Sequence, residues 1–221
     1  MLYLIPTPIG NLEDLTFRAL KTMSEIDLLL AEDTRTTGRL LAHYDLKVPM
    51  KSFHAFNEHK LLAEFVSLLL DGKNVGLVSD AGTPGISDPG FLLVRAAIEE
   101  GIEVTCLPGP TAIIPAIVMS GLPSDKFYFE GFLPHKKGRK TRWEFLANLP
   151  CTIVLYESPH RIAKCIKEVV DHLGADRKVC VSREISKKFE ENIRGTAEEV
   201  YGLIKDKGLK GEIVVCIQGN T

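Results

Sequence analysis

The chain has 221 residues, of which 45% are hydrophobic, and its formal net charge at pH 7 is −2. This size and apolar content suit two folded domains, and the small net charge excludes a surface that binds nucleic acid everywhere. The apolar runs are far shorter than the roughly 20 residues that cross a bilayer, and residues 1–10 do not resemble a secretory signal, so we expect a cytoplasmic protein without a membrane segment.

The first half of the sequence alternates short apolar strands with helical patterns, which predicts a mainly parallel sheet covered by helices on both faces. Asp88 and Pro89 are typical of the first positions of a helix, and Gly101 is typical of the residue after its end. The expected strands lie at 2–6, 27–31, 50–53, 75–78 and 102–107, and the expected helices lie at 15–24, from 34, at 60–70, at 91–100 and from 112 to 120.

The pattern changes at the segment GLPS, residues 121–124, where we expect a second domain to begin. The sequence thus predicts an N-terminal mainly parallel α/β domain at 1–120 and a C-terminal mixed-sheet α/β domain at 121–221. Strands at 178–183 and 189–194 are too close for a helix between them, which predicts an antiparallel pair. The other expected elements are strands at 127–132, 152–156 and 212–218, a helix near 141–148, a helix capped by Ser158 and Pro159 that ends at Gly174, and a helix after a capping box formed by Thr196 and Glu199.

Four loops that follow strands have compositions suited to binding a ligand. The longest is SDAGTPGISDPG at 79–90, where glycines allow close approach to the backbone and prolines fix its path; a plain connection in this position usually has about 2 to 6 residues. The others are TPIGN at 7–11, PGPTA at 108–112 and YESPHR at 156–161. Loops that follow parallel strands emerge at one edge of the sheet, so we expect the first three to form one pocket. The sequence contains neither GxGxxG nor GxxxxGK[ST], which removes the main support for a dinucleotide or a nucleoside triphosphate.

Two short charged segments are candidates for chemistry. The segment AEDTRTT at 31–37 places two carboxylates and an arginine at the end of a strand, where capping of the next helix explains them equally well. In YESPHR, capping accounts for Ser158 and Pro159, which leaves a glutamate, a histidine and an arginine for proton transfer or phosphate contact.

The segment HKKGRKTRW at 135–143 contains five Lys or Arg residues and no acid. It is either a solvated loop or a contact to an RNA backbone, with Trp143 available for stacking on a base if it lies outside the core. The five cysteines have no paired close spacing, so we expect reduced thiols and no metal site.

Taken together, LYLIPTPIGNLEDLTFRAL, AEDTRTTGRLL, SDAGTPGISDPG, LPGPTA, FEGFLP and YESPHR occur in an order that resembles bacterial small-subunit ribosomal RNA methyltransferases of the tetrapyrrole methylase superfamily. The resemblance covers residues 2–218. It implies two α/β domains of the tetrapyrrole methylase type, with the methyl donor S-adenosylmethionine in the cleft between them. It also implies a homodimer that 2′-O-methylates a cytidine in the decoding region of 16S ribosomal RNA. The substrate is then either naked 16S RNA or the small ribosomal subunit.

The resemblance further implies which residues bind the donor. The GDP-type loop of the superfamily is replaced here by Gly82, Thr83 and Pro84, so backbone contacts are expected where a carboxylate contact is lost. The implied donor-binding residues are Pro8, Ile9, Gly82, Thr83, Pro84, Gly85, Ile86, Pro108, Thr111, Ala112, Leu155, Tyr156 and Ile213.

A ribose 2′-hydroxyl is a poor nucleophile while protonated, so the transfer needs a base or a charge that stabilises the alkoxide. We expect the catalytic residue among Glu32, Asp33, Glu157 and His160, and no metal. The expected RNA-binding residues are Arg35, Lys136, Lys137, Arg139, Lys140 and Arg161. Two alternatives remain open at this point, namely a methyltransferase for a small tetrapyrrole-like molecule and a noncatalytic RNA-binding assembly factor.

Overall fold

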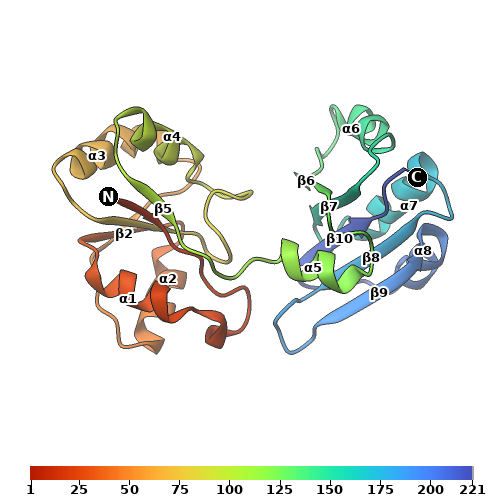
Figure 1. The fold of residues 1–221 in the computed structure, drawn as a ribbon. Coiled ribbons are helices and arrows are strands. Elements are labelled where there is room, and N and C mark those ends of the chain that lie inside the picture. Colours follow the sequence, from red (N-terminus) through yellow and green to blue (C-terminus); the bar gives the residue numbers. More distant parts are fainter. Residues whose placement is uncertain (221) are drawn as a thin grey trace. The chain divides into compact units, whose positions relative to one another are not determined.

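The computed structural model describes residues 1–220 and is shown in Figure 1. Contacts between residues divide the chain into two compact units, Met1–Thr111 and Ala112–Thr221. The expected boundary between residues 120 and 121 lies after helix α5 (Ile113–Ser120), whereas α5 packs on three strands of the second unit. The division therefore precedes α5, because the buried side chains of this helix belong to the second unit.

The first unit is built on a five-stranded, fully parallel sheet with the strand order β3-β2-β4-β1-β5. Helices α1 and α2 cover one face and helices α3 and α4 cover the other, as Figure 1 shows. This arrangement confirms the predicted parallel sheet. The strands are β1 (Leu2–Leu4), β2 (Leu28–Ala31), β3 (Met50–Ser52), β4 (Val75–Val78) and β5 (Val104–Cys106), and the helices are η1 (Leu12–Asp14), α1 (Phe17–Glu25), α2 (Thr34–His43), α3 (Glu58–Leu70) and α4 (Phe91–Glu99).

The central strands of this sheet are apolar along their whole length because both of their faces are covered. All four residues of β4 are buried, and a Cβ atom at Gly76 would lie 2.6 Å from Cδ1 of Ile26. Ile26, which directly follows α1, therefore packs tightly against the middle of the sheet.

The second unit is built on a mixed five-stranded sheet with the order β6-β7-β10-β8-β9. Strands β6 and β7 are parallel and the remaining pairs are antiparallel, including the predicted pair of β8 and β9. Helices α6, α7 and α8 share one core with the sheet, and α5 packs over β8, β9 and β10. The elements are β6 (Phe127–Phe132), α6 (Arg139–Leu146), β7 (Thr152–Glu157), α7 (Ile162–Leu173), β8 (Lys178–Arg183), β9 (Glu191–Thr196), α8 (Ala197–Ile204) and β10 (Ile213–Ile217).

Two of the predicted helix caps are wrong, and one is confirmed. Helix α4 begins after Gly90, which has φ 135°, and no side chain caps it, while Asp88 interacts with Ser79 instead. Helix α7 follows Arg161 without a side-chain cap, since the hydroxyl of Ser158 accepts only from the backbone of His160 at 3.3 Å. The capping box of Thr196 and Glu199 is present. Within residues 1–220, none of the helices has the length and hydropathy of a membrane span.

Candidate functional site

Three of the ligand-type loops meet at one edge of the first sheet. Thr7 and Gly82 exchange two backbone hydrogen bonds of 2.9 Å, and the Thr7 hydroxyl donates to the Ser79 carbonyl oxygen at 3.1 Å. The Thr83 hydroxyl donates to the carbonyl oxygen of Pro110 at 3.2 Å. The predicted convergence of TPIGN, SDAGTPGISDPG and PGPTA is confirmed, and it follows from the parallel pairing of β1, β4 and β5.

The backbone of the longest loop is shaped by residues in the left-handed region. Gly82 and Gly85 have φ 81° and 83°, and Ser87, which has a Cβ, is also held at φ 62°. A Cβ atom placed on Gly85 would meet no other atom within 4 Å, so open space lies directly against this backbone. Such a wall offers peptide groups rather than charged side chains to a ligand.

The expected donor contacts in these loops differ in exposure. Gly82 and Pro84 are buried within the loop, whereas Ile86 is 42% exposed. The remaining positions in the first three loops are half-buried or exposed, namely Pro8, Ile9, Thr83, Gly85, Pro108, Thr111 and Ala112.

Carboxylates from separate segments gather at the same sheet edge. Glu32 follows β2, Asp80 follows β4, and Asp88 lies near the end of the long loop. Burial raises the pKa of Asp88 to about 6, and the negative charge of Glu32 contributes to this shift. Burial also raises the pKa of Glu32, which interacts electrostatically with Asp80 and His54. Carboxyl groups in such a setting exchange protons closer to neutral pH than ordinary acids do.

The neighbouring Asp33 has a different role. Its carboxylate accepts from the backbone N–H of Arg35 at 2.8 Å, which makes it the N-cap of α2, and it also pairs with the Arg35 guanidinium. These hydrogen bonds hold the pKa of Asp33 at about 2. The capping interpretation is therefore confirmed, and a carboxylate held ionised in this way is a poor proton acceptor. Arg35 is paired with Asp33, although its side chain is 85% exposed.

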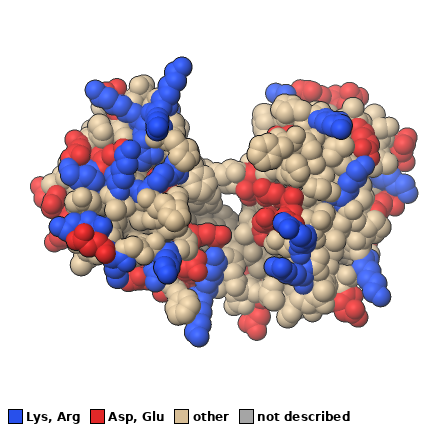
Figure 2. Space-filling model, turned by 180° about the vertical axis from the view of Figure 1, so that it is seen from behind, with Lys and Arg blue, Asp and Glu red and all other residues tan. Residues whose placement is uncertain are grey.

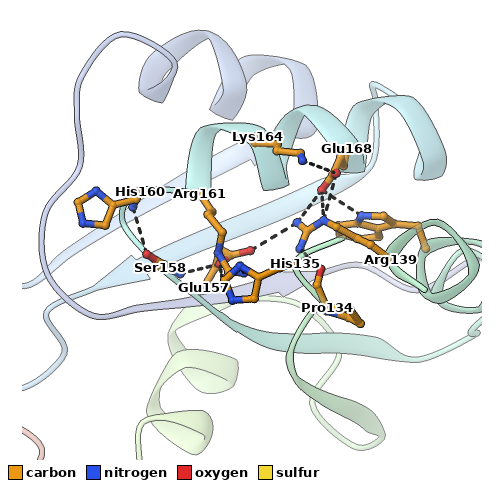
Figure 3. A network of polar contacts seen from close by, with 10 residues as sticks. Pro134, His135, Arg139, Glu157, Ser158, His160, Arg161, Lys164 and Glu168 are labelled. Carbon is orange, nitrogen blue, oxygen red and sulfur yellow. Dashed lines mark hydrogen bonds and ion pairs between the residues drawn. The ribbon is translucent and has the colours of Figure 1, made fainter. Parts of the chain in front are cut away.

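In the second unit, Glu157 lies inside a network of ion pairs, which Figure 3 shows. Its side chain is fully buried, with Oε1 2.7 Å from Nη2 of Arg161 and Oε2 3.5 Å from Nη2 of Arg139. Arg139 also binds Glu168, with Nη2 2.6 Å from Oε2, and its residue exposure is 5%. Both groups are enclosed and paired, which argues against Glu157 as a base and against Arg139 as an RNA contact. In the same view, the His160 ring points away from the network.

The structure separates the basic run 135–143 into internal and exposed residues. Trp143 is fully buried and its indole N–H donates to Glu168 at 3.1 Å, so it belongs to the core and does not stack on a base. Arg142 pairs with Glu130, and Lys140 lies 3.9 Å from Glu144. Lys136 and Lys137 are exposed and have no ion pair with any described residue. On the face drawn in Figure 2, basic and acidic side chains are intermingled, in agreement with the small net charge.

The three residues of the second unit that are expected to contact the donor differ in solvent exposure. Leu155 and Ile213 are core residues with exposures of 0% and 3%, so their side chains are not available to a ligand. Tyr156 is half-buried, and its ring lies against Phe129 and Phe132 at centroid distances of 5.1 and 5.5 Å.

Comparison with known proteins agrees with this architecture. Residues 1–201 match the family model described as Tetrapyrrole (Corrin/Porphyrin) Methylases. The chain belongs to the tetrapyrrole methylase family. Among its relatives, the Ribosomal RNA small subunit methyltransferase I of Thermotoga maritima is 46% identical over 99% of this chain and 98% of the relative. The proteins of the same name in Synechocystis and Halalkalibacterium halodurans are 46% and 44% identical, and the chain spans 80% and 76% of their lengths.

Solved structures show that this tetrapyrrole methylase has the fold of its family. The methyltransferase CobJ has a TM-score of 0.71 at 15% identity and covers 99% of this chain and 93% of its own. A cobalt precorrin-4 methyltransferase has a TM-score of 0.68 at 19% identity and covers 98% and 94%. The uroporphyrin-III C-methyltransferase of Thermus thermophilus, complexed with S-adenosyl homocysteine, has a TM-score of 0.66 at 18% identity and covers 98% and 96%.

Two carboxylates at the sheet edge of this tetrapyrrole methylase, Asp80 and Asp88, are not predicted as site residues by the sequence pattern. Asp80 accepts a hydrogen bond from the backbone N–H of Asp33 at 3.1 Å, which joins the loop after β4 to the start of α2. The sequence pattern predicts a helix cap at Asp88, although the position of Asp88 within the glycine-rich loop is the signal that indicates the site. No group of His, Cys, Asp and Glu within residues 1–220 has the arrangement of a metal site.

Proposed function

We propose that this S-adenosylmethionine-dependent methyltransferase transfers a methyl group to the 2′-hydroxyl of a cytidine in 16S ribosomal RNA. The observation that carries the proposal is the similarity, at 44–46% identity over nearly the whole chain, to proteins named Ribosomal RNA small subunit methyltransferase I. The cytidine and its 2′-oxygen come from the sequence resemblance. We further propose that the protein acts as a homodimer in the cytoplasm.

The converging loops of the first unit fit S-adenosylmethionine. The open space beside Gly85 and the exposed side chain of Ile86 give a peptide surface with an apolar edge, which suits a ligand that carries an adenosine and an amino-acid group. Backbone groups at residues 82–86 replace the lost carboxylate contact, and Pro8, Ile9, Pro108, Thr111 and Ala112 form the rest of the proposed site. When bound, the donor supplies an electrophilic methyl group on a sulfonium.

Glu32 is the proposed proton acceptor. It is half-buried at the end of β2, its pKa is raised by burial, and it has no Lys or Arg ion pair among the described residues. A carboxyl with a raised pKa is better matched to removing a hydroxyl proton than one held ionised by an arginine, as Asp33 is. His160 is exposed and stands as the second candidate.

The exposed cations of the two units are the proposed RNA contacts. Lys136 and Lys137 are free to bind phosphates, and Arg35 presents an exposed guanidinium beside the carboxylates. Lys140 adds a third exposed lysine on the first turn of α6. Contacts of this type position an RNA without reading its sequence.

The decisive experiment maps 2′-O-methylation on 16S RNA from cells with and without this protein. We expect one cytidine to lose its 2′-O-methyl group when the protein is removed and to regain it when the gene is restored. Purified protein, labelled donor and either naked 16S RNA or small subunits identify the substrate form. Donor binding without methyl incorporation would favour the assembly-factor alternative, and methylation of a tetrapyrrole but not of RNA would favour the small-molecule alternative.

A further inference from the structure

The turn at 134–138 joins β6 to α6 and is held at both ends. Leu133 before it is 1% exposed and Arg139 after it is 5% exposed, and the Arg139 backbone N–H donates to the Lys136 carbonyl oxygen at 3.2 Å. Arg139 Nη1 also donates to the carbonyl oxygen of Pro134 at 3.1 Å, as Figure 3 shows. The turn therefore has a fixed path although its middle residues are exposed.

The contact between Arg161 and His135 favours one tautomer of the imidazole. Arg161 Nη1 lies 3.1 Å from Nδ1 of His135. A guanidinium has only donors, so this contact is a hydrogen bond only in the tautomer whose Nδ1 accepts and whose hydrogen is on Nε2. Arg161 is itself held by buried Glu157, with Nη2 2.7 Å from Oε1. The buried carboxylate thus orients the arginine, and the arginine favours this tautomer of an exposed histidine.

The same turn presents two free ammonium groups. Lys136 and Lys137 follow His135 directly, and the first turn of α6 contains no acidic residue. Cations at the start of a helix are unfavourable for the helix itself, so helix stability does not explain them. An N–H donor beside two ammonium groups on a fixed turn matches the chemistry of a phosphate oxygen.

We propose that His135 donates its Nε2–H to a backbone phosphate of the substrate RNA beside Lys136 and Lys137, and that Arg161 is the positioning residue that holds it. This inference rests on the proposed function, since it takes ribosomal RNA as the ligand. It changes the expected role of Arg161 from a phosphate contact to a group that acts through His135. In this proposal the buried network of Arg139, Glu157 and Glu168 holds the turn that binds RNA.

The test compares His135→Asn with Lys136→Ala and Lys137→Ala in binding to 16S RNA as a function of salt. Asparagine keeps an acceptor for Arg161 near the position of Nδ1 but cannot reach the position of Nε2. We expect His135→Asn to weaken RNA binding about 10-fold with an unchanged salt dependence, because a neutral donor releases no counterion. Each lysine variant should lower the slope of log K against log salt by about 0.7 to 0.9. Lys205→Ala, at an exposed position on the second unit, is the matched control and should change neither quantity.

A separate measurement tests whether Arg161 positions His135. In ¹⁵N NMR spectra of the free protein, the His135 ring should show the Nε2–H tautomer alone, and Arg161→Gln should produce a mixture. The double variant should bind RNA no more weakly than His135→Asn alone, because Arg161 acts through the contact that His135→Asn already removes. Thermal unfolding by circular dichroism checks that each variant is folded.

Several results would overturn this inference. They are unchanged RNA affinity for His135→Asn, a smaller salt slope for that variant, and an Nδ1–H or doubly protonated ring in the free wild-type protein. The ring spectrum is measured without RNA, so it distinguishes the failure of this inference from the failure of the proposed function. The latter would appear as a wild-type protein that neither binds nor methylates ribosomal RNA.

Discussion

Burial raises the pKa values of two carboxyl groups in the first unit. Glu32 and Asp88 are half-buried at the end of the sheet, and the charge of Glu32 raises the cost of ionising Asp88. Ser79 offsets part of this cost by a hydrogen bond to Asp88. Residues with such environments are more common at catalytic sites than elsewhere.

Glu32→Gln tests the proposed proton acceptor. We expect kcat for RNA methylation to fall by about 10² to 10⁴, the usual contribution of a general base, while donor affinity stays the same. Single-turnover methylation and calorimetric donor binding measure the two quantities separately. The matched control is Glu100→Gln at an exposed position, and wild-type turnover by Glu32→Gln would refute the assignment.

Asp88→Asn tests the buried carboxyl through stability. The pKa of Asp88 is raised to about 6 in the folded state, so between pH 4 and 6 the folded protein binds more protons than the unfolded chain. The Asp88 contribution to stability therefore falls as pH rises through this range. Above pH 7 the variant should be more stable than wild type by about 1 kcal/mol, a value reduced for partial solvent exposure, and the gain should vanish near pH 4.

Urea unfolding at pH 4, 6 and 8 measures this difference. Asp125→Asn, at an exposed position, is the control. A gain for Asp88→Asn that is equal at all three pH values would contradict the prediction.

At the level of elements, the network around Glu157 joins the end of β7 to α6 and α7. Its two arginines come from the starts of those helices, and Glu168 lies within α7. Buried ion pairs of this kind cost much when one partner is removed, because the other partner is left uncompensated.

Glu157→Gln should therefore destabilise the protein by about 3 to 5 kcal/mol, since Arg139 and Arg161 would lose a buried counter-charge. Denaturant unfolding gives the free energy, and Glu144→Gln, in an exposed pair, should change it by less than about 1 kcal/mol. A variant with wild-type stability and no methylation would restore Glu157 as a catalytic candidate.

Most elements could be predicted because their signals are local. Strand β4 is a short apolar run bounded by turn residues, and Gly121 ends α5 in the left-handed conformation with φ 73°. The convergence of the three loops could be predicted too, since it follows from parallel strand order and needs no side-chain detail.

The roles of individual charged residues could not be predicted in the same way. Arg139 looks like its exposed neighbours in HKKGRKTRW, and its partner Glu168 is 29 residues away on another helix. Asp88 has the local pattern of a helix cap, yet contacts with Glu32 and Ser79 decide its environment. Local composition indicates a basic segment, whereas only the tertiary structure shows which cations are free.

At the level of the whole molecule, each unit has its own sheet and its own core residues. The loops proposed to hold the donor at residues 7–11 and 79–90, and residues 108–111 of the third loop, belong to the first unit, whereas the basic turn belongs to the second. Donor binding should therefore be visible as protection of specific backbone segments.

S-adenosylhomocysteine at about 100 times its Kd should raise the free energy of unfolding by about 2.7 kcal/mol, as mass action requires for a ligand of the folded state. Hydrogen exchange should slow most in the segments at 79–90 and 108–112. ATP is the matched control, because the sequence lacks the GxxxxGK[ST] loop of nucleoside triphosphate sites. Stabilisation by ATP, or none by S-adenosylhomocysteine, would contradict the proposed donor site.

Trp143 is the single tryptophan of the chain, and it lies in the core of the second unit with its ring stacked on His172 at a centroid distance of 6.2 Å. Its fluorescence emission therefore reports the folding of that unit, while the first unit contains no such chromophore. Far-ultraviolet circular dichroism, in contrast, detects the helices of both units. Melting curves recorded with the two signals will coincide if the units unfold together and will separate if they unfold in succession, so the wild-type protein carries its own probe of cooperativity.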